Sequence, residues 1–150
     1  MAGFNDTYPH LGAKSFEQME GDIYNGISDA IYRARAAAPN ATIKVVGYPH
    51  ITNGNGDTCG FNVIPGVMLP NPTPAVEEIE WLLQRAAQNA SRDAGAVFVD
   101  SKPISNGHEQ CSHDRWLVGI IDTTVPDRYN LLLHMTRTGL HEIARNAGSA

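Results

Sequence analysis

The stretch TIKVVG at residues 42–47 is the segment that decides the fold class. Its β-branched and apolar residues are typical of a short strand that is buried on both faces. A second run of this kind, AVFVD, follows at residues 96–100. A helical pattern lies between the two runs, and parallel strands are joined by such crossover connections. The two runs therefore predict a parallel α/β sheet.

Three segments around these strands carry the apolar spacing of a helix. Residues 16–38 repeat apolar side chains every three or four positions, with Ser15 as the N-cap and Pro39 at the end. A second helix is predicted from Pro74 to about residue 94, and a third over residues 136–147.

The connections between these elements are long. Residues 48–74 are rich in Gly, Asn and Pro, residues 101–114 are polar, and both segments are predicted to be loops. Loops of this length commonly carry function. Residues 1–150 contain no internal repeat and no linker, so we expect a single domain with helices flanking a parallel sheet in three layers.

Composition excludes several classes of function. With 42% hydrophobic and 18% charged residues among 150, the chain is globular rather than disordered. The net charge of -5 argues against a nucleic-acid partner, whose binders carry clustered Lys and Arg. No apolar run is long enough to span a membrane. The first residues have neither the basic start nor the apolar core of a signal peptide.

Two cysteines, Cys59 and Cys111, lie in loop-like surroundings. They are either unrelated thiols or a disulfide that closes a long loop, and a disulfide would indicate an oxidising compartment. Their spacing does not fit a zinc ribbon, which needs paired Cys-x-x-Cys motifs.

His134 is the strongest candidate for catalysis. It follows an apolar run and comes just before the predicted last helix, where a general base often lies in α/β hydrolases. Its unperturbed pKa near neutrality suits proton transfer. The structural alternative is an ordinary loop or core histidine. The other histidines compete for the same role: His10, His50, His108, His113 and His141.

Two further features have both a functional and a structural interpretation. Asn5 could present its side-chain amide to an oxyanion, or form a turn with Asp6 near the N-terminus. Asp100 could place a carboxylate at the sheet's functional edge, or cap the strand end.

A metal site around Cys111 is conceivable from the nearby residues His108, Glu109, His113 and Asp114. The fixed spacing of a helical His-Glu-x-x-His site is absent, so we expect no metal and no cofactor.

Taken in order, these segments resemble the SGNH (GDSL) hydrolase family, in particular its secreted actinobacterial lipases and esterases. Residues 3–6 (GFND) look like the family's Gly-x-Asn-Asp block, and residues 38–49 are similar to its helix-to-strand segment. Residues 95–100, residues 107–111 (GHEQC) and Trp116 follow in the expected order. His134 with Gly139 looks like the His-Pro-x-x-x-Gly of the fifth block, with Met135 in place of the proline.

The resemblance implies roles for several residues. Asn5 and Gly3 would belong to the oxyanion hole, His134 would be the general base, and the carbonyl of Leu131 would orient it, because Leu131 replaces the usual Asp. Cys59 and Cys111 fall where the family carries a disulfide. The fold would be flavodoxin-like, the substrate a small ester or lipid, and the location extracellular.

Two blocks of the family have no counterpart in these residues: the Gly-Asp-Ser block with the nucleophilic serine, and the glycine block that gives a second oxyanion donor. The chain is therefore expected to match the C-terminal two thirds of the usual domain, so that the domain is truncated at its N-terminus. The leading hypothesis is a carboxylic ester hydrolase whose nucleophile is not among these residues. The alternative is a non-catalytic remnant or binding module, which would self-associate as a homo-oligomer through an exposed sheet edge.

Overall fold

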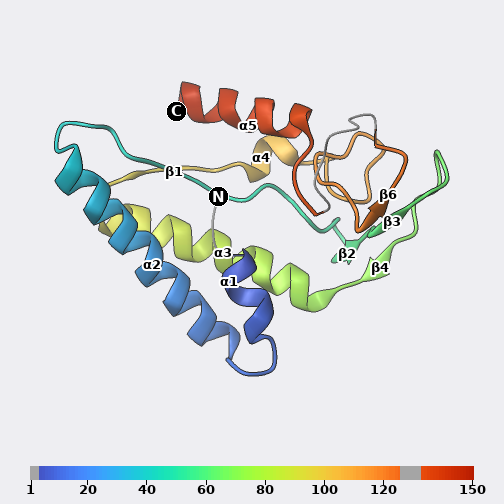
Figure 1. Cartoon of the computed structure of the whole chain (residues 1–150), viewed down its shortest axis with the longest axis horizontal. Coiled ribbons are helices and arrows are strands. Elements are labelled where there is room, and N and C mark those ends of the chain that lie inside the picture. The colour runs from blue at the N-terminus through green and yellow to red at the C-terminus, as the bar shows by residue number, and fades with distance from the viewer. Residues whose placement is uncertain (1–3, 126–132) are drawn as a thin grey trace. The chain divides into compact units, whose positions relative to one another are not determined.

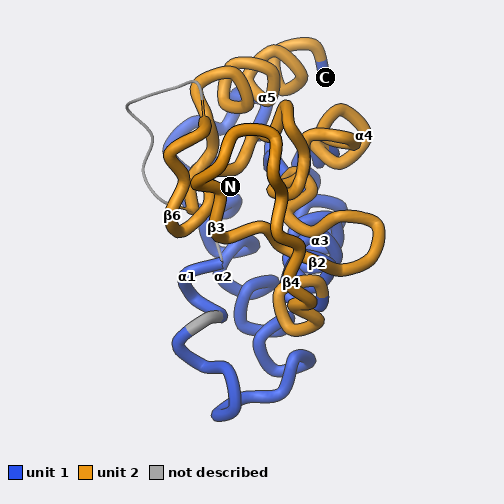
Figure 2. The backbone as a smooth tube through the Cα atoms, turned by 90° about the vertical axis from the view of Figure 1, so that its right-hand side faces the viewer, with its two compact units in different colours: residues 1–48, 78–100, 150 blue, residues 49–77, 101–149 orange. Residues whose placement is uncertain are grey.

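The computed structural model describes residues 4–125 and 133–150 and divides into two compact units. Unit 1 comprises residues 1–48, 78–100 and 150, and unit 2 comprises residues 49–77 and 101–149 (Figure 2). The expectation of a single domain stays a prediction.

Helices dominate unit 1 (Figure 1). After the short helices α1 (Phe4–Thr7) and η1 (Tyr8–His10) come α2 (Phe16–Ala37) and α3 (Pro74–Asp93), whose residues from 78 onward lie in this unit. The predicted Ser15 cap is present: its hydroxyl accepts from the Gln18 amide, and the Gln18 side chain accepts from the Ser15 amide. This reciprocal capping box fixes where α2 begins.

The sheet of unit 1 has two parallel strands, β1 (Lys44–Val46) and β5 (Val97–Val99), with Lys44 opposite Val97. The predicted α/β class is therefore confirmed. The expected burial on both faces is wrong, because all of β1 is half-buried and Val97 is 41% exposed. Each of these strands pairs with one neighbour among the described residues, so the sheet is too narrow to bury them fully.

The core of unit 1 lies between its two long helices. Met19 and Ile23 of α2 pack with four buried residues of α3, namely Ile79, Leu82, Leu83 and Ala86. Phe4 and Tyr48 pack against this cluster, which ties α1 and the segment after β1 to the helices. At an apolar transfer free energy of ~25 cal/mol per Å², such burial is the main stabilising contribution of this unit.

Unit 2 is built from loops with short pairings. β2 (Asp57–Thr58) pairs antiparallel with β4 (Asn71–Pro72), and β3 (Phe61–Asn62) pairs parallel with β6 (Ile121–Asp122). Two helices complete the unit, α4 (Lys102–Ser105) and α5 (Arg137–Ser149). The loops expected over 48–74 and 101–114 thus contain short strands and α4. Two-residue strands have no periodicity that a sequence could reveal.

No helix in the described ranges is long and apolar enough to cross a membrane.

Candidate functional site

His134 lies in unit 2 at an exposed turn that leads into α5. Its backbone runs antiparallel to the segment around Leu117. The Val118 amide donates to the His134 carbonyl at 2.9 Å, and the Thr136 amide donates to the Trp116 carbonyl at 2.7 Å. These main-chain bonds fix the backbone from which the imidazole projects.

Two backbone features set the direction in which the chain enters α5. Leu133 has a φ of 60°, a left-handed conformation that costs a non-glycine residue about 1 kcal/mol. Thr136 then caps the helix, because its hydroxyl accepts from the Gly139 amide at 3.1 Å. A side chain on Gly139 would place its Cβ 2.6 Å from the Cβ of Trp116, so only glycine allows α5 to approach this closely.

Asn5 lies in unit 1, exposed on α1. The residues around it are held in place. The buried Thr7 donates its hydroxyl proton to the Phe4 carbonyl at 2.7 Å, and the Phe4 amide donates to the Tyr48 hydroxyl at 3.4 Å. Burial raises the pKa of Tyr48, and the charge of Asp6 adds to this, while the bond from Phe4 opposes it. A neutral Tyr48 hydroxyl therefore supports α1. No pattern in the sequence predicts this role for Tyr48.

The remaining residues of the predicted site are placed as follows. Gly3 and Leu131 lie outside the described residues. Asn5 belongs to unit 1 and His134 to unit 2.

Asp100 is tied to α3. Its Oδ1 accepts from Nε2 of the mostly buried Gln84 at 3.0 Å. A Cβ on Gly47 would meet both Gln84 and the Phe98 ring at 3.0 Å or less, so the glycine at the end of β1 lets helix and strands meet. These contacts favour the structural interpretation of Asp100.

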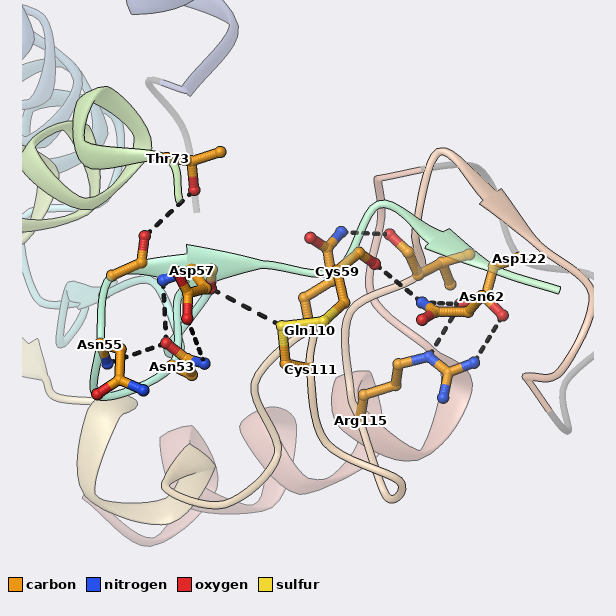
Figure 3. The surroundings of a disulfide bond; sticks show 12 residues. Asn53, Asn55, Asp57, Cys59, Asn62, Thr73, Gln110, Cys111, Arg115 and Asp122 are labelled. Atoms are coloured by element: carbon orange, nitrogen blue, oxygen red, sulfur yellow. Dashed lines mark hydrogen bonds and ion pairs between the residues drawn. A yellow bond between two sulfur atoms is a disulfide. The ribbon is translucent and has the colours of Figure 1, made fainter. Parts of the chain in front are cut away.

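Cys59 and Cys111 form a disulfide in unit 2, with their Cα atoms 4.9 Å apart and a sequence separation of 52 (Figure 3). This confirms the pairing that the family resemblance implied. Cys59 is fully buried, and its carbonyl accepts from Nδ2 of the buried Asn62 at 2.9 Å. The disulfide therefore joins the turn between β2 and β3 to the polar loop after α4.

A buried ion pair lies close to this disulfide. Arg115 contacts both carboxylate oxygens of Asp122, through Nη2 at 2.6 Å and Nε at 2.9 Å (Figure 3). Asn62 and the Gly119 amide also donate to Asp122. The two ionic side chains are 3% and 0% exposed. No sequence pattern identifies this cluster, because Arg115 lies in a loop, Asp122 ends a two-residue strand and no spacing rule pairs them.

The ion pair predicts a loss of stability in acid. Burial alone would raise the pKa of Asp122, but the bonds from Arg115, Gly119 and Asn62 outweigh it and lower the pKa from 3.8 to about 2. The folded state thus binds this proton less readily than the unfolded chain. The resulting stabilisation, about 2 kcal/mol, is complete above about pH 4 and is lost as the pH falls toward 2.

Urea unfolding at several pH values between about 2 and 7 checks this expectation. In Asp122→Asn the acid-dependent part should shrink by about 2 kcal/mol. Asp29→Asn is the matched control, because it removes an exposed carboxylate paired with Arg33 on α2. An Asp122→Asn variant with the wild-type acid profile would contradict the prediction.

The alternative metal site is not formed. Cys111 is bonded to Cys59 and has no thiolate to offer. The His108 ring stacks on Trp116 with centroids 4.3 Å apart, and its Nδ1 lies 3.3 Å from the Asp114 carboxylate. Across residues 4–125 and 133–150 no three His, Cys, Asp or Glu side chains are grouped to hold a metal ion.

All seven serines lie within the described ranges, and none is presented as a nucleophile. Ser15 caps α2, Ser91 donates to the Ala87 carbonyl, and the buried Ser105 bonds to the His50 amide and the Lys102 carbonyl. Ser101 stands between β5 and α4, but its side chain is fully buried.

Comparisons with known proteins identify similar lipases. The sequence is 30% identical to Lipase 2 of Streptomyces coelicolor over 108 residues. Two solved structures share the fold, each with a TM-score of 0.60 over 97% of this chain: phospholipase A1 from Streptomyces albidoflavus, at 21% identity, and an extracellular lipase from Streptomyces rimosus, at 18%. The chain is thus similar in sequence to a lipase and shares the fold of SGNH-type lipases.

The match covers only part of the length of each of these relatives. The 108 aligned residues are 71% of this chain and 36% of Lipase 2, and the chain spans 64% of each of the two solved structures. No family model matches the sequence. The predicted resemblance to actinobacterial lipases is thus confirmed, while the roles of individual residues remain predictions.

Proposed function

We propose that this chain takes part in carboxylic ester hydrolysis, with His134 as the general base. The position of His134 carries the proposal: it is exposed, and main-chain bonds hold its backbone at the turn before α5. The similarity to Lipase 2 of Streptomyces coelicolor suggests the reaction class. Asn5 and Gly3 are proposed as oxyanion donors, and the Leu131 carbonyl as the group that orients the imidazole.

The proposed reaction is acyl transfer. A ring nitrogen of His134 takes the proton from the attacking O–H while the oxygen bonds to the ester carbon, and the carbonyl electron pair moves to the oxygen. The Asn5 amide donates to that oxyanion, a contact worth about 3 kcal/mol in acyl transfer. Collapse of the intermediate expels the alkoxide, which takes the proton from His134. This chemistry needs no cofactor.

We assign the attacking group to none of the seven serines, because each is buried, caps or bonds to a helix, or lies on an exposed helix or loop without a nucleophile elbow. Water activated by His134 is then the nucleophile that these residues can use. Acyl transfer without the serine keeps only the part of the rate that comes from the oxyanion hole and binding, roughly 10³-fold over water.

The substrate and the location follow from the relatives. The similar proteins are a lipase, a phospholipase A1 and an extracellular lipase, so we propose a small ester or lipid as the substrate and secretion as the location. The Cys59–Cys111 disulfide supports an oxidising compartment.

A serine-reactive phosphonate, combined with a p-nitrophenyl butyrate assay, tests the proposal. We expect the chain to hydrolyse the ester faster than buffer does and to gain no phosphonate mass. An adduct on a serine, with Ser101 between strand and helix as the first position to inspect, would overturn the assignment of the nucleophile. A rate equal to that of buffer would overturn the catalytic proposal.

One observation favours the non-catalytic alternative, in which the chain binds without turnover. Unit 2 has an open groove of about 840 Å³, bounded by the stacked His108 and Trp116 and by Thr138 and Arg145 of α5. Residues of α4, the polar loop and α5 line this groove, so its formation does not depend on a nucleophile. Self-association through a sheet edge stays a prediction of this alternative, and light scattering over a range of concentrations checks it.

A further inference from the structure

Unit 2 exposes a set of large apolar side chains that the ester-hydrolysis proposal does not use. They lie in two short segments, residues 61–69 and residues 120–121, and each is between 41% and 57% exposed. We call them the apolar patch: Phe61, Val63, Ile64, Val67, Leu69, Ile120 and Ile121. Apolar exposure on this scale usually marks a binding surface.

Strand pairing brings the two segments together. Phe61 lies opposite Ile121 in the parallel β3–β6 pair, and the next pair, Asn62 and Asp122, turns its side chains inward to the ion pair with Arg115. Because side chains alternate between the faces of a strand, Phe61 and Val63 share the outer face. In Figure 1 the segment between β3 and β4 extends away from the rest of the unit.

The patch is uncharged. No Asp, Glu, Lys or Arg occurs from residue 58 to residue 76, or from residue 116 to residue 121. The nearest acidic side chains at the two ends, Asp57 and Asp122, are engaged by Asn53 and Arg115. The whole chain carries a net charge of -5. A surface of this kind gains nothing from an anionic membrane, which would repel the chain.

The composition also argues against a protein partner. Protein interfaces are enriched in Tyr, Trp, Phe, Met and Arg and carry about one hydrogen bond per 100–200 Å². The patch has one aromatic residue, Phe61, and six aliphatic ones. Aliphatic side chains without charge match the acyl region just below the headgroups of a lipid layer.

We propose that the apolar patch seats the protein on the surface of a zwitterionic phospholipid layer. The backbone that carries it is already fixed by the Cys59–Cys111 disulfide and by the buried ion pair, so little ordering is needed on contact. Leu133, which is 52% exposed and donates its amide to the Gly119 carbonyl, extends the same surface to the residue before His134. Any connection between lipid contact at this surface and catalysis at His134 rests on the proposed function.

Flotation with vesicles of ether-linked phosphatidylcholine tests the proposal, because these lipids cannot be hydrolysed. We expect the wild-type chain to float with the vesicles. The triple variant Phe61→Ser, Ile64→Ser, Leu69→Ser should bind at least tenfold less. The matched control is Tyr32→Ser with Leu140→Ser, which removes two equally exposed apolar side chains outside the patch and should bind as the wild type does.

Several results would overturn the proposal. Wild-type chain that stays with the soluble fraction, or a triple variant that floats as well as wild type, would exclude lipid contact by the patch. Stronger binding to phosphatidylserine vesicles would exclude the zwitterionic preference. A dimer that light scattering detects in the wild type and not in the triple variant would identify a second copy as the occupant. His134→Ala should still float with the vesicles, so a failure of the catalytic proposal can be distinguished from a failure of the lipid-binding proposal. Circular dichroism and the intact disulfide confirm that the variants fold.

Discussion

Removing the Cys59–Cys111 disulfide is expected to lower the free energy of unfolding by about 4 kcal/mol, since the bond closes a loop of more than 50 residues in the unfolded chain. For a chain of this size the loss corresponds to a melting temperature lower by roughly 10 °C. The effect should be large because unit 2 is built from two-residue strands, which contribute few backbone bonds of their own.

The variant Cys59→Ser, Cys111→Ser, measured by urea and thermal unfolding, checks this expectation. Reducing agent should lower the stability of the wild type to that of the double variant and should leave the double variant unchanged. A loss below about 1 kcal/mol would contradict the prediction and would mean that the unfolded chain retains structure that already constrains this loop.

Replacing His134 by alanine is expected to reduce ester hydrolysis by about 100-fold, the usual contribution of a positioned general base, or to the buffer rate if that is reached first. The stability should hardly change, because the side chain of His134 is exposed and the bonds that fix the turn are made by its backbone. Initial rates with p-nitrophenyl butyrate measure the effect.

His141→Ala is the matched control for this experiment. His141 is also exposed in unit 2, on α5 beside Glu142, and it has no place in the proposed reaction. We expect this variant to keep the wild-type rate. If both variants lose activity equally, or if neither does, His134 is not the base.

Much of the fold could be predicted from local patterns. The helix expected over residues 16–38 is α2, and its Ser15 cap is present. The two strand runs pair in parallel as expected. These elements are readable because amphipathic spacing and capping act within a few residues of the chain. The expectation that the first strand is buried on both faces was wrong. The sequence shows that its side chains are apolar, but the number of neighbouring strands decides whether they are covered.

The site could be predicted in outline. The sequence placed His134 at the entry to the last helix, and the structure has it there. The main-chain bonds to the 116–118 segment, the left-handed Leu133 and the close contact of Gly139 with Trp116 were not visible in the sequence. Each depends on a segment at least 15 residues away or on a backbone angle, and neither has a residue-type signature here.

By itself, the sequence determined the α/β class, the three long helices, the candidate base and, through family resemblance, the pairing of Cys59 with Cys111. Only the tertiary structure decided how the loop-rich half is organised: the β3–β6 pair, the buried Arg115–Asp122 pair beneath it and the apolar patch on its outer face. The physical reason is the range of the interactions. Helices and capping are encoded between near neighbours, whereas these pairings join residues about 60 positions apart or lie in irregular chain, where no repeating pattern identifies the partner.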